Sequence, residues 1–372
     1  MRLLITLSLS IILLFALPAN AEISRDKDLK IETLATGLSI PWGMAVMPDN
    51  KLLITQRGGK LVRLNPQTGK ITDLTGLPGD IRVEGQGGLF DVALPPDYKD
   101  SQWIYFSYTK DVDGQGATTL ARAKLSGTKL VNWQELLATK SRTDNTVHYG
   151  GRIAFDGQSH VFLPIGDRGT RSNAQDRSNH AGSILRLNMD GSVPADNPFV
   201  NKENVLPEIW SYGHRNPQGL FYNLDNNELW SIEHGPRGGD EINLIEPGRN
   251  YGWPEISHGQ EYWAPIPVGK GTHREGMEQP VQVYVPSIAP SSLIQYRGEL
   301  FNGWKGNLLS GALVLQHLNR IELDSNNAAV NETRLLETLN SRIRNVIEAP
   351  DGALLVATDQ GDILRITPAS NE

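Results

Sequence analysis

One pattern of hydrophobic and polar positions recurs along this chain. Residues 47–65, MPDNKLLITQRGGKLVRLN, place a polar turn before a short apolar run and a glycine-containing turn before a second run. Residues 349–367, APDGALLVATDQGDILRIT, repeat this order closely. Short runs rich in Val, Ile, Leu and Thr, bounded by Asp, Asn, Gly and Pro, are typical of β-hairpins. The pattern therefore predicts a repeated hairpin unit.

Further variants of the same phrase lie between these two copies. The six openings fall at Pro48, Asp97, Asp156, Asp225, Asn302 and Asp351. Their spacing of about 50 to 75 residues fits four-stranded blades that carry loop insertions. A β-sandwich would also be all-β, but it would not give six copies of one hairpin. We therefore predict an all-β fold, a six-bladed β-propeller with a central channel. Residues 29–38 are strand-like, and we expect them to complete the sheet of the last copy and close the ring.

The first 21 residues differ from the rest of the chain. Arg2 gives a short basic start, residues 3–17 are almost wholly apolar, and Ala19, Asn20 and Ala21 form a small-x-small site. This order predicts a secretory signal peptide, because the apolar run is short for a membrane span. An uncleaved membrane anchor is the alternative. We expect cleavage near Ala21, one propeller domain over residues 22–372, no membrane span in the mature chain, and a periplasmic or secreted location.

Composition and known motifs exclude several classes of function. The 372 residues include no cysteine, so an exported chain would be held together without disulfides, and a soft-metal site is disfavoured. The formal net charge is −7 and no dense basic cluster occurs, which argues against nucleic-acid binding. The chain has no G-x-S-x-G, H-E-x-x-H or P-loop motif. Its glycine pairs are not followed by helices, which argues against a Rossmann site.

The loop insertions hold the candidate chemistry, since propeller sites gather on the loops of one face. Gln86, in VEGQGGLFDVAL, offers an amide beside glycines that admit a planar ligand. His148, in TVHYGGRIAFD, is suited to take a proton near neutral pH. Arg215 and Asn216, in GHRNPQGL, can hold a carboxylate or quinone oxygen. Taken singly, each residue also fits an ordinary turn or surface position.

Two further segments concentrate charge. Residues 233–243, EHGPRGGDEIN, combine acidic side chains with a Gly-Pro turn, and a hard cation such as calcium prefers carboxylates and backbone carbonyls. The spacing is not that of an EF-hand, and a solvated acidic loop is the alternative. In SRIRNV, Arg342 and Arg344 alternate along a strand-like run and should share one face. Two guanidinium groups on one face indicate an anion between them, unless this is an exposed edge.

Taken together and in this order, the motifs resemble the soluble quinoprotein glucose/sorbosone dehydrogenase family. The resemblance is strongest to the periplasmic aldose sugar dehydrogenases in that family, and it covers essentially the whole mature chain. Its most specific parts are GQGGLFDVAL, HYGGRIAFDG, GHRNPQGL, EHGPRGGDEIN, NYGWP and RIR. The resemblance implies a six-bladed propeller that binds pyrroloquinoline quinone (PQQ) and calcium. It also implies oxidation of the C1 hydroxyl of aldose sugars to lactones.

The resemblance also implies a role for individual residues. His148 matches the general base, which takes the hydroxyl proton while hydride passes from C1 to the quinone. The positions that match cofactor contacts are Gln86, Arg215, Asn216, Ala312, Leu313, Val314, Arg342 and Arg344. The carbonyls of Gly235 and Pro236 match ligands of the catalytic calcium, and Glu241 and Tyr251 match a second, structural calcium site. Some members carry a lysine in the segment where this chain has Val314.

Two other functions stay open alongside this one. A calcium-dependent lactonase on a similar propeller would need no quinone, and a non-catalytic propeller would use the loops to hold a partner. The paired arginines and the RNPQG turn favour the quinone, because a lactonase has no polyanionic cofactor to bind. We expect an aldose substrate, a soluble or quinone electron acceptor, and a monomer or weak dimer. Residues 262–280 match the family least, so the sugar is not specified.

Overall fold

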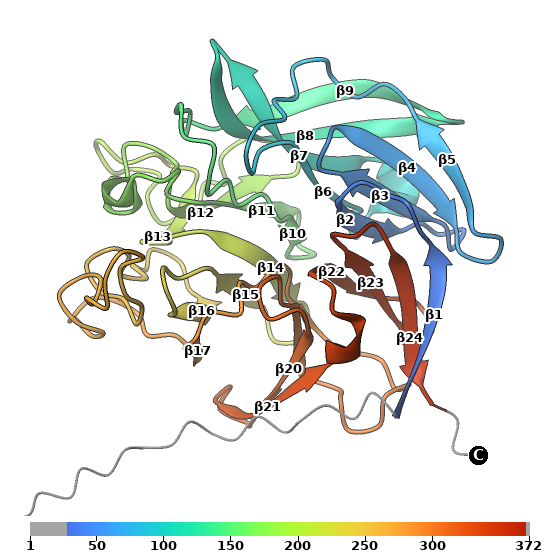
Figure 1. The fold of residues 1–372 in the computed structure, drawn as a ribbon. Helices are drawn as coiled ribbons and strands as arrows, with labels where there is room; N and C mark the ends of the chain where they lie inside the picture. Colours follow the sequence, from blue (N-terminus) through green and yellow to red (C-terminus); the bar gives the residue numbers. More distant parts are fainter. Residues whose placement is uncertain (1–27, 370–372) are drawn as a thin grey trace, which may run out of the picture.

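The computed structural model describes residues 28–369 as a ring of six four-stranded antiparallel sheets, shown in Figure 1. The prediction of an all-β, six-bladed propeller is confirmed. The helices that lie wholly in this range are α1 (Tyr98–Ser101) and the 3-10 helices η2 (Arg171–Gln175) and η3 (Glu337–Leu339). No helix among residues 28–369 is long and apolar enough to cross a membrane. The predicted signal peptide lies outside the described residues.

The blades follow one another along the chain. Blade 1 contains β2 (Pro41–Val46), β3 (Leu52–Gln56), β4 (Lys60–Asn65) and β5 (Lys70–Leu74), and blade 2 contains β6 (Leu89–Ala93), β7 (Ile104–Val112), β8 (Gln115–Ser126) and β9 (Lys129–Ala138). Blade 3 contains β10 (Ala154–Phe155), β11 (His160–Ile165), β12 (Ser183–Asn188) and β13 (Ile209–Tyr212), and blade 4 contains β14 (Pro217–Asn223), β15 (Glu228–Glu233), β16 (Asp240–Ile245) and β17 (Gln282–Tyr284). Blade 5 contains β18 (Ile294–Gln295), β19 (Leu308–Gly311), β20 (Leu318–Leu323) and β21 (Ala329–Leu335), and blade 6 contains β22 (Ile343–Glu348), β23 (Leu354–Thr358), β24 (Ile363–Pro368) and β1 (Leu29–Ala35).

The repeated phrase forms the second and third strands of each blade. In blade 1 it gives β3 and β4, and in blade 6 it gives β23 and β24. The first strand of each blade lines the central channel, and the fourth strand lies at the periphery (Figure 1). Loops that join second to third strands, and loops that join one blade to the next, therefore share one face. We call this the upper face, and it carries the motif loops.

The ring is closed by β1, as the sequence predicts. This strand pairs antiparallel with β24, from Leu29 opposite Pro368 to Ala35 opposite Ile363. Leu34 and Ala35 are buried in a core cluster shared by blades 1 and 6. Figure 1 shows β1 beside β24 at the edge of the ring. The start of the described chain thus supplies the outer strand of the last blade.

A buried arginine joins several blades across the channel. Arg152 pairs with Asp91 (Nη1 to Oδ1, 3.2 Å) and donates to the carbonyls of Trp42, Gln218 and Ser291 at 3.4, 3.2 and 3.0 Å. These partners lie in or beside four other blades. Its guanidinium also stacks 4.0 Å from the centre of the Trp42 ring. Arg152 lines the channel and Trp42 lines the cavity of the upper face, so this cluster separates the two spaces.

Candidate active site

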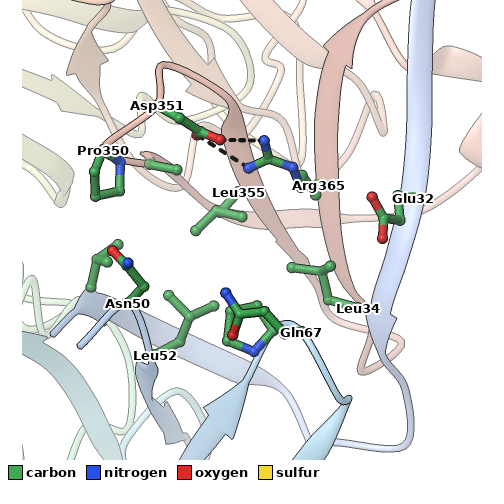
Figure 2. Close-up of a pocket in the computed structure, with 12 residues that line it drawn as sticks. Glu32, Leu34, Asn50, Leu52, Gln67, Pro350, Asp351, Leu355 and Arg365 are labelled. Atoms are coloured by element: carbon green, nitrogen blue, oxygen red, sulfur yellow. Dashed lines mark hydrogen bonds and ion pairs between the residues drawn. The ribbon is translucent and has the colours of Figure 1, made fainter.

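A hollow of about 490 Å³ lies between blades 1 and 6 on the lower face. Figure 2 shows its apolar floor, which includes Leu34, Leu52 and Leu355, and the ion pair between Asp351 and Arg365. None of the residues predicted to bind a ligand lines this hollow. Its charged pair is already satisfied within the protein. The chemistry that the sequence indicates therefore lies elsewhere.

On the upper face, loops and strand ends from all six blades enclose a cavity of about 140 Å³. Five of the predicted cofactor contacts line it together, namely Gln86, Asn216, Leu313, Arg342 and Arg344. Residues that the sequence did not single out complete the wall, namely Trp42, Arg57, Phe90, Tyr149, Gly150, Gln218, His234 and Ala289. Segments separated by almost the full length of the chain thus meet around one space.

One side of the cavity is aromatic. The rings of Trp42 and Phe90 lie 5.2 Å apart, and those of Phe90 and Tyr149 lie 5.6 Å apart, in tilted contact. All three side chains are buried and form a cluster of their own. Tilted ring contacts of this kind fix the orientation of each ring. The cavity therefore has a rigid, apolar wall suited to a flat ring system.

Another part of the cavity wall is charged and consists of guanidinium groups. Arg342 contacts Asp359 through Nε to Oδ2 at 2.9 Å, and Arg344 makes a two-point contact with the same carboxylate at 2.7 and 2.8 Å. The anion expected between these arginines is thus Asp359 of the protein itself. Burial opposes ionisation, but both guanidinium groups act more strongly and lower the pKa of Asp359 below its usual value. With Arg57, three cations and one carboxylate face this region, which leaves it net positive.

His148 is held in a defined orientation beside the cavity. Its Nδ1 lies 2.6 Å from Oδ1 of Asp167, and Trp253 donates its indole N–H to the other carboxylate oxygen at 2.8 Å. Burial would raise the pKa of Asp167, but its contact with His148 and further hydrogen bonds lower it below the usual value. An ionised carboxylate only accepts hydrogen bonds, so Nδ1 of His148 carries the proton. Its Nε2 is therefore the basic nitrogen.

The loop that carries His148 is held by the turn after β11, residues 166–169. Arg168 is fully buried and donates to the carbonyls of Val147, Gly116, Ser141 and Asn145 at 2.6–3.0 Å. His148 has a φ of 55°, an unusual value for this residue type, and its amide donates to Oε1 of Gln86 at 2.8 Å. The backbone of His148 and its ring are thus fixed by separate contacts, which favours a preorganised base.

The Arg215–Asn216 turn is organised by Glu233 at the end of β15. The Glu233 carboxylate accepts the amides of Arg215 and Asn216 at 2.6 and 3.3 Å and contacts Nδ1 of His214 at 2.9 Å. The Arg215 guanidinium donates to the His234 carbonyl at 3.1 Å and to the Tyr262 hydroxyl at 3.3 Å. Arg215 does not line the 140 Å³ cavity, and it borders a smaller one beside it.

The acidic stretch of residues 233–243 contains a carboxylate that is fully engaged and backbone carbonyls that are not. Asp240 accepts the amides of Gly235, Ile288 and Ala289 and the Ser287 hydroxyl at 2.6–2.9 Å, so it braces the loop. Within residues 28–369, no hydrogen bond is accepted by the carbonyl of Gly235 or of Pro236. Those residues also contain no group of three or more acidic or histidine side chains placed to hold a metal. Backbone carbonyls rather than carboxylates are thus the free oxygens at this turn.

Glu241 and Tyr251 meet at the smaller cavity of about 20 Å³, which Glu233 also lines. Glu233 and Glu241 are directly opposite each other on β15 and β16. Burial, followed by the charge of Glu233, raises the pKa of Glu241 to about 8. The Tyr251 hydroxyl donates to the Leu244 carbonyl at 2.6 Å and accepts the Glu246 amide at 2.8 Å. The hydroxyl is thus engaged by backbone groups on both sides, whereas the Tyr251 carbonyl accepts no hydrogen bond within residues 28–369.

The remaining predicted contacts lie apart from the cavity wall. Ala312 is fully buried in a core cluster shared by blades 4 and 5, and Val314 is 58% exposed. Of the segment 312–314, only Leu313 lines the cavity. The β19–β20 loop thus contributes an apolar side chain and no charge to the wall.

Comparison with known proteins agrees with this geometry. The family model described as "Glucose / Sorbosone dehydrogenase" matches residues 38–365. The chain belongs to the glucose/sorbosone dehydrogenase family. It is 39% identical over 348 residues to aldose sugar dehydrogenase YliI of Escherichia coli, covering 91% of this chain and 93% of the relative.

Solved structures from the family share the whole fold. The apo-form of soluble aldose sugar dehydrogenase from Escherichia coli has a TM-score of 0.88 and 37% identity, covering 92% of this chain and 100% of the other. The PQQ-bound form of aldose sugar dehydrogenase from Streptomyces coelicolor has a TM-score of 0.75 and 29% identity, covering 92% and 98%. Both of these solved relatives are named as aldose sugar dehydrogenases.

The sequence interpretation missed several residues of this family member, and they all lie in turns that follow the second strand of a blade. Arg57, His234 and Asp359 each directly follow the second strand of a blade, since β3 ends at Gln56, β15 at Glu233 and β23 at Thr358. Asp167 and Arg168 lie in the corresponding turn after β11. Comparison of the repeat copies would have shown this signal, because the turn after the second strand carries a charged or titratable residue in four blades, directly after the strand in blades 1, 4 and 6 and after Gly166 in blade 3.

Two histidines with lowered pKa values are expected to make the stability of this glucose/sorbosone dehydrogenase family member dependent on pH. Burial lowers the pKa of His234 to about 3 and that of His317 to about 4. Between those values and about 6.5, the unfolded chain binds more protons, so the free energy of unfolding falls as pH falls. We expect a loss of about 2 kcal/mol per histidine between neutral pH and about pH 5.

Thermal or urea unfolding across this pH range measures the effect. His317→Gln keeps a donor for the Leu315 carbonyl, 3.1 Å from Nδ1, but does not titrate, so it should flatten the curve. The exposed His273, replaced by Gln, is the control and should leave the curve unchanged. An unchanged slope in His317→Gln would contradict the prediction.

Proposed function

We propose that this protein oxidises the C1 hydroxyl of aldose sugars to lactones, with PQQ and calcium as cofactors. The observation that carries the proposal is the upper-face cavity, where an aromatic wall, amides and a net positive charge meet beside an oriented histidine. The PQQ-bound structure of the Streptomyces coelicolor relative supports the same cofactor. A propeller that only held a protein partner would not need an oriented base in this place.

The residues present fit a planar polycarboxylate. Trp42, Phe90 and Tyr149 offer ring faces, while Gln86 and Asn216 offer amides that can donate to ring carbonyls. Arg342 and Arg344 offer guanidinium groups that suit carboxylates. When bound, PQQ would supply the electron acceptor that side chains lack. The protein's contribution is then to bind the cofactor, orient it and exclude water.

Calcium fits the Gly235–Pro236 turn. Its two carbonyl oxygens accept no hydrogen bond within residues 28–369, and calcium prefers such oxygen ligands. A cation at this turn, next to the cavity that His234 lines, would stabilise negative charge that develops during oxidation. We assign a second, structural ion to Glu241 and the Tyr251 carbonyl, which border the small cavity with Glu233.

His148 is the base in this proposal. Its Nε2 would take the proton from the sugar hydroxyl, and Asp167 would hold the ring in the correct tautomer and stabilise the imidazolium that forms. The electrons would leave to a soluble or quinone acceptor. The location that fits this chemistry is periplasmic or secreted, after removal of the segment that ends near Ala21.

The test is dye reduction by purified apo-protein with glucose and other aldoses, with and without added PQQ and calcium. We expect activity only when both are present, and the relative rates would identify the preferred sugar. No activity together with no PQQ binding in an absorbance titration would refute the proposal. Hydrolysis of lactones that needs calcium alone would instead identify a lactonase.

A further inference from the structure

Arg57 is fixed at its backbone between blades 1 and 2. It follows β3 directly, its amide donates to the Ile40 carbonyl at 3.1 Å, and its carbonyl accepts the Leu89 amide at 3.0 Å. Gly88 packs so closely that a Cβ there would overlap the Arg57 carbonyl. The backbone position of this arginine is therefore set by the ring itself. Only the side chain can adapt to a ligand.

The guanidinium of Arg57 lines the 140 Å³ cavity without a protein partner. Within residues 28–369 it donates no hydrogen bond and has no carboxylate within 4.0 Å. Arg342 and Arg344 share the single carboxylate of Asp359. Burial, followed by repulsion from Arg344, lowers the pKa of Arg57. A partly buried cation beside two others is unfavourable unless an anion is bound.

The β19–β20 loop supplies no cation to the cavity wall. Val314 lies in this loop, is 58% exposed and does not line the cavity. Its neighbour Leu313 faces the cavity instead. Arg57 enters the same cavity from a different blade. The wall thus keeps a third positive group, although it comes from the β3–β4 turn and not from the β19–β20 loop.

We propose that Arg57 binds a carboxylate of the cofactor and supplies a positive charge that the β19–β20 loop does not. This inference rests on the proposed function, because it takes PQQ as the anion. A guanidinium group matches a carboxylate in shape and can donate two parallel hydrogen bonds. Arg57 would then be the charged cofactor contact of blade 1, and Arg342 and Arg344 would be the charged contacts of blade 6.

The test measures cofactor binding rather than turnover. PQQ is titrated into apo-protein in the presence of calcium, followed by absorbance, for wild type, Arg57→Gln, Arg57→Lys and the control Arg63→Gln on β4. We expect the Kd to rise about 10- to 100-fold in Arg57→Gln, less in Arg57→Lys, and not in Arg63→Gln. The dependence of Kd on salt should also weaken in Arg57→Gln, since one charge contact is lost.

A wild-type Kd in folded Arg57→Gln would overturn the role of Arg57 while leaving the proposed function intact. No PQQ binding by wild type would overturn the proposed function, and the inference with it. If Arg57→Gln does not fold, modification of wild type by an arginine-specific dicarbonyl gives an independent answer. Peptide mass spectrometry should then show that PQQ protects Arg57 but not Arg63, and equal reaction of Arg57 with and without PQQ would refute the inference.

Discussion

Replacing His148 with alanine is expected to lower kcat by about 10² to 10⁴ while leaving PQQ affinity nearly unchanged. The physical reason lies in the geometry of the ring. Nδ1 is bonded to Asp167 at 2.6 Å, so Nε2 is the free base, and alanine removes it. The contact that ties this residue to Gln86 uses the backbone amide of His148, which alanine retains. Steady-state dye reduction and PQQ titration on the same preparations measure the two quantities separately.

Two further variants show whether the lower kcat of His148→Ala comes from the loss of the base. Asp167→Asn keeps the size of the side chain but cannot hold the same tautomer, so it should lower kcat to an intermediate level with similar cofactor binding. His273→Ala removes an exposed histidine and should leave kcat unchanged. Full activity in His148→Ala would assign the base elsewhere. Loss of PQQ binding in that variant would instead show that His148 shapes the pocket.

The fold could be predicted from sequence because its information is local and repeated. Each copy encodes one hairpin, and six copies predict a ring whose geometry follows from the number of blades. The closing strand was also predictable, since residues 29–38 are strand-like and precede the first copy. The order β1-β24-β23-β22 in the last blade confirms it. Such a pattern is visible without knowing which side chains are in contact.

The site could be predicted only in part, for the opposite reason. The motif loops could be assigned to one face because of their place between strands. The interaction partners of their side chains, however, depend on how different blades pack together. Asp359 and Arg344 lie in the same blade, on different strands or turns. No local sequence pattern shows that the Asp359 carboxylate occupies the space between two arginines. In the sequence, Arg57 resembles an ordinary turn residue. Only the closed ring places it near Arg344. Three-dimensional closure, and not any motif, creates the charge balance of the cavity.

Replacing Gly235 with alanine should be the most damaging small substitution in the acidic loop. Gly235 does not need a left-handed backbone, but a Cβ there would overlap the carbonyl oxygens of Gly238 and Gly239. This overlap can be removed only if the backbone on one side of the turn moves. Overpacking of this kind costs about 1–3 kcal/mol, and here it displaces the carbonyls that we assign to calcium. We expect a lower melting temperature and a calcium affinity reduced by at least about tenfold.

The measurement is thermal unfolding across a calcium titration, with dye-linked activity at limiting calcium. Wild type should gain stability as calcium rises, because an ion that binds only the folded state stabilises it. Gly235→Ala should lose most of that gain, and its activity should need far more calcium. Gly79→Ala is the matched control, since a Cβ there meets nothing within 4 Å. If Gly235→Ala kept the calcium response of wild type, the Gly235–Pro236 turn would not be the calcium site, because the ion depends on those carbonyls being where the glycine allows them to be.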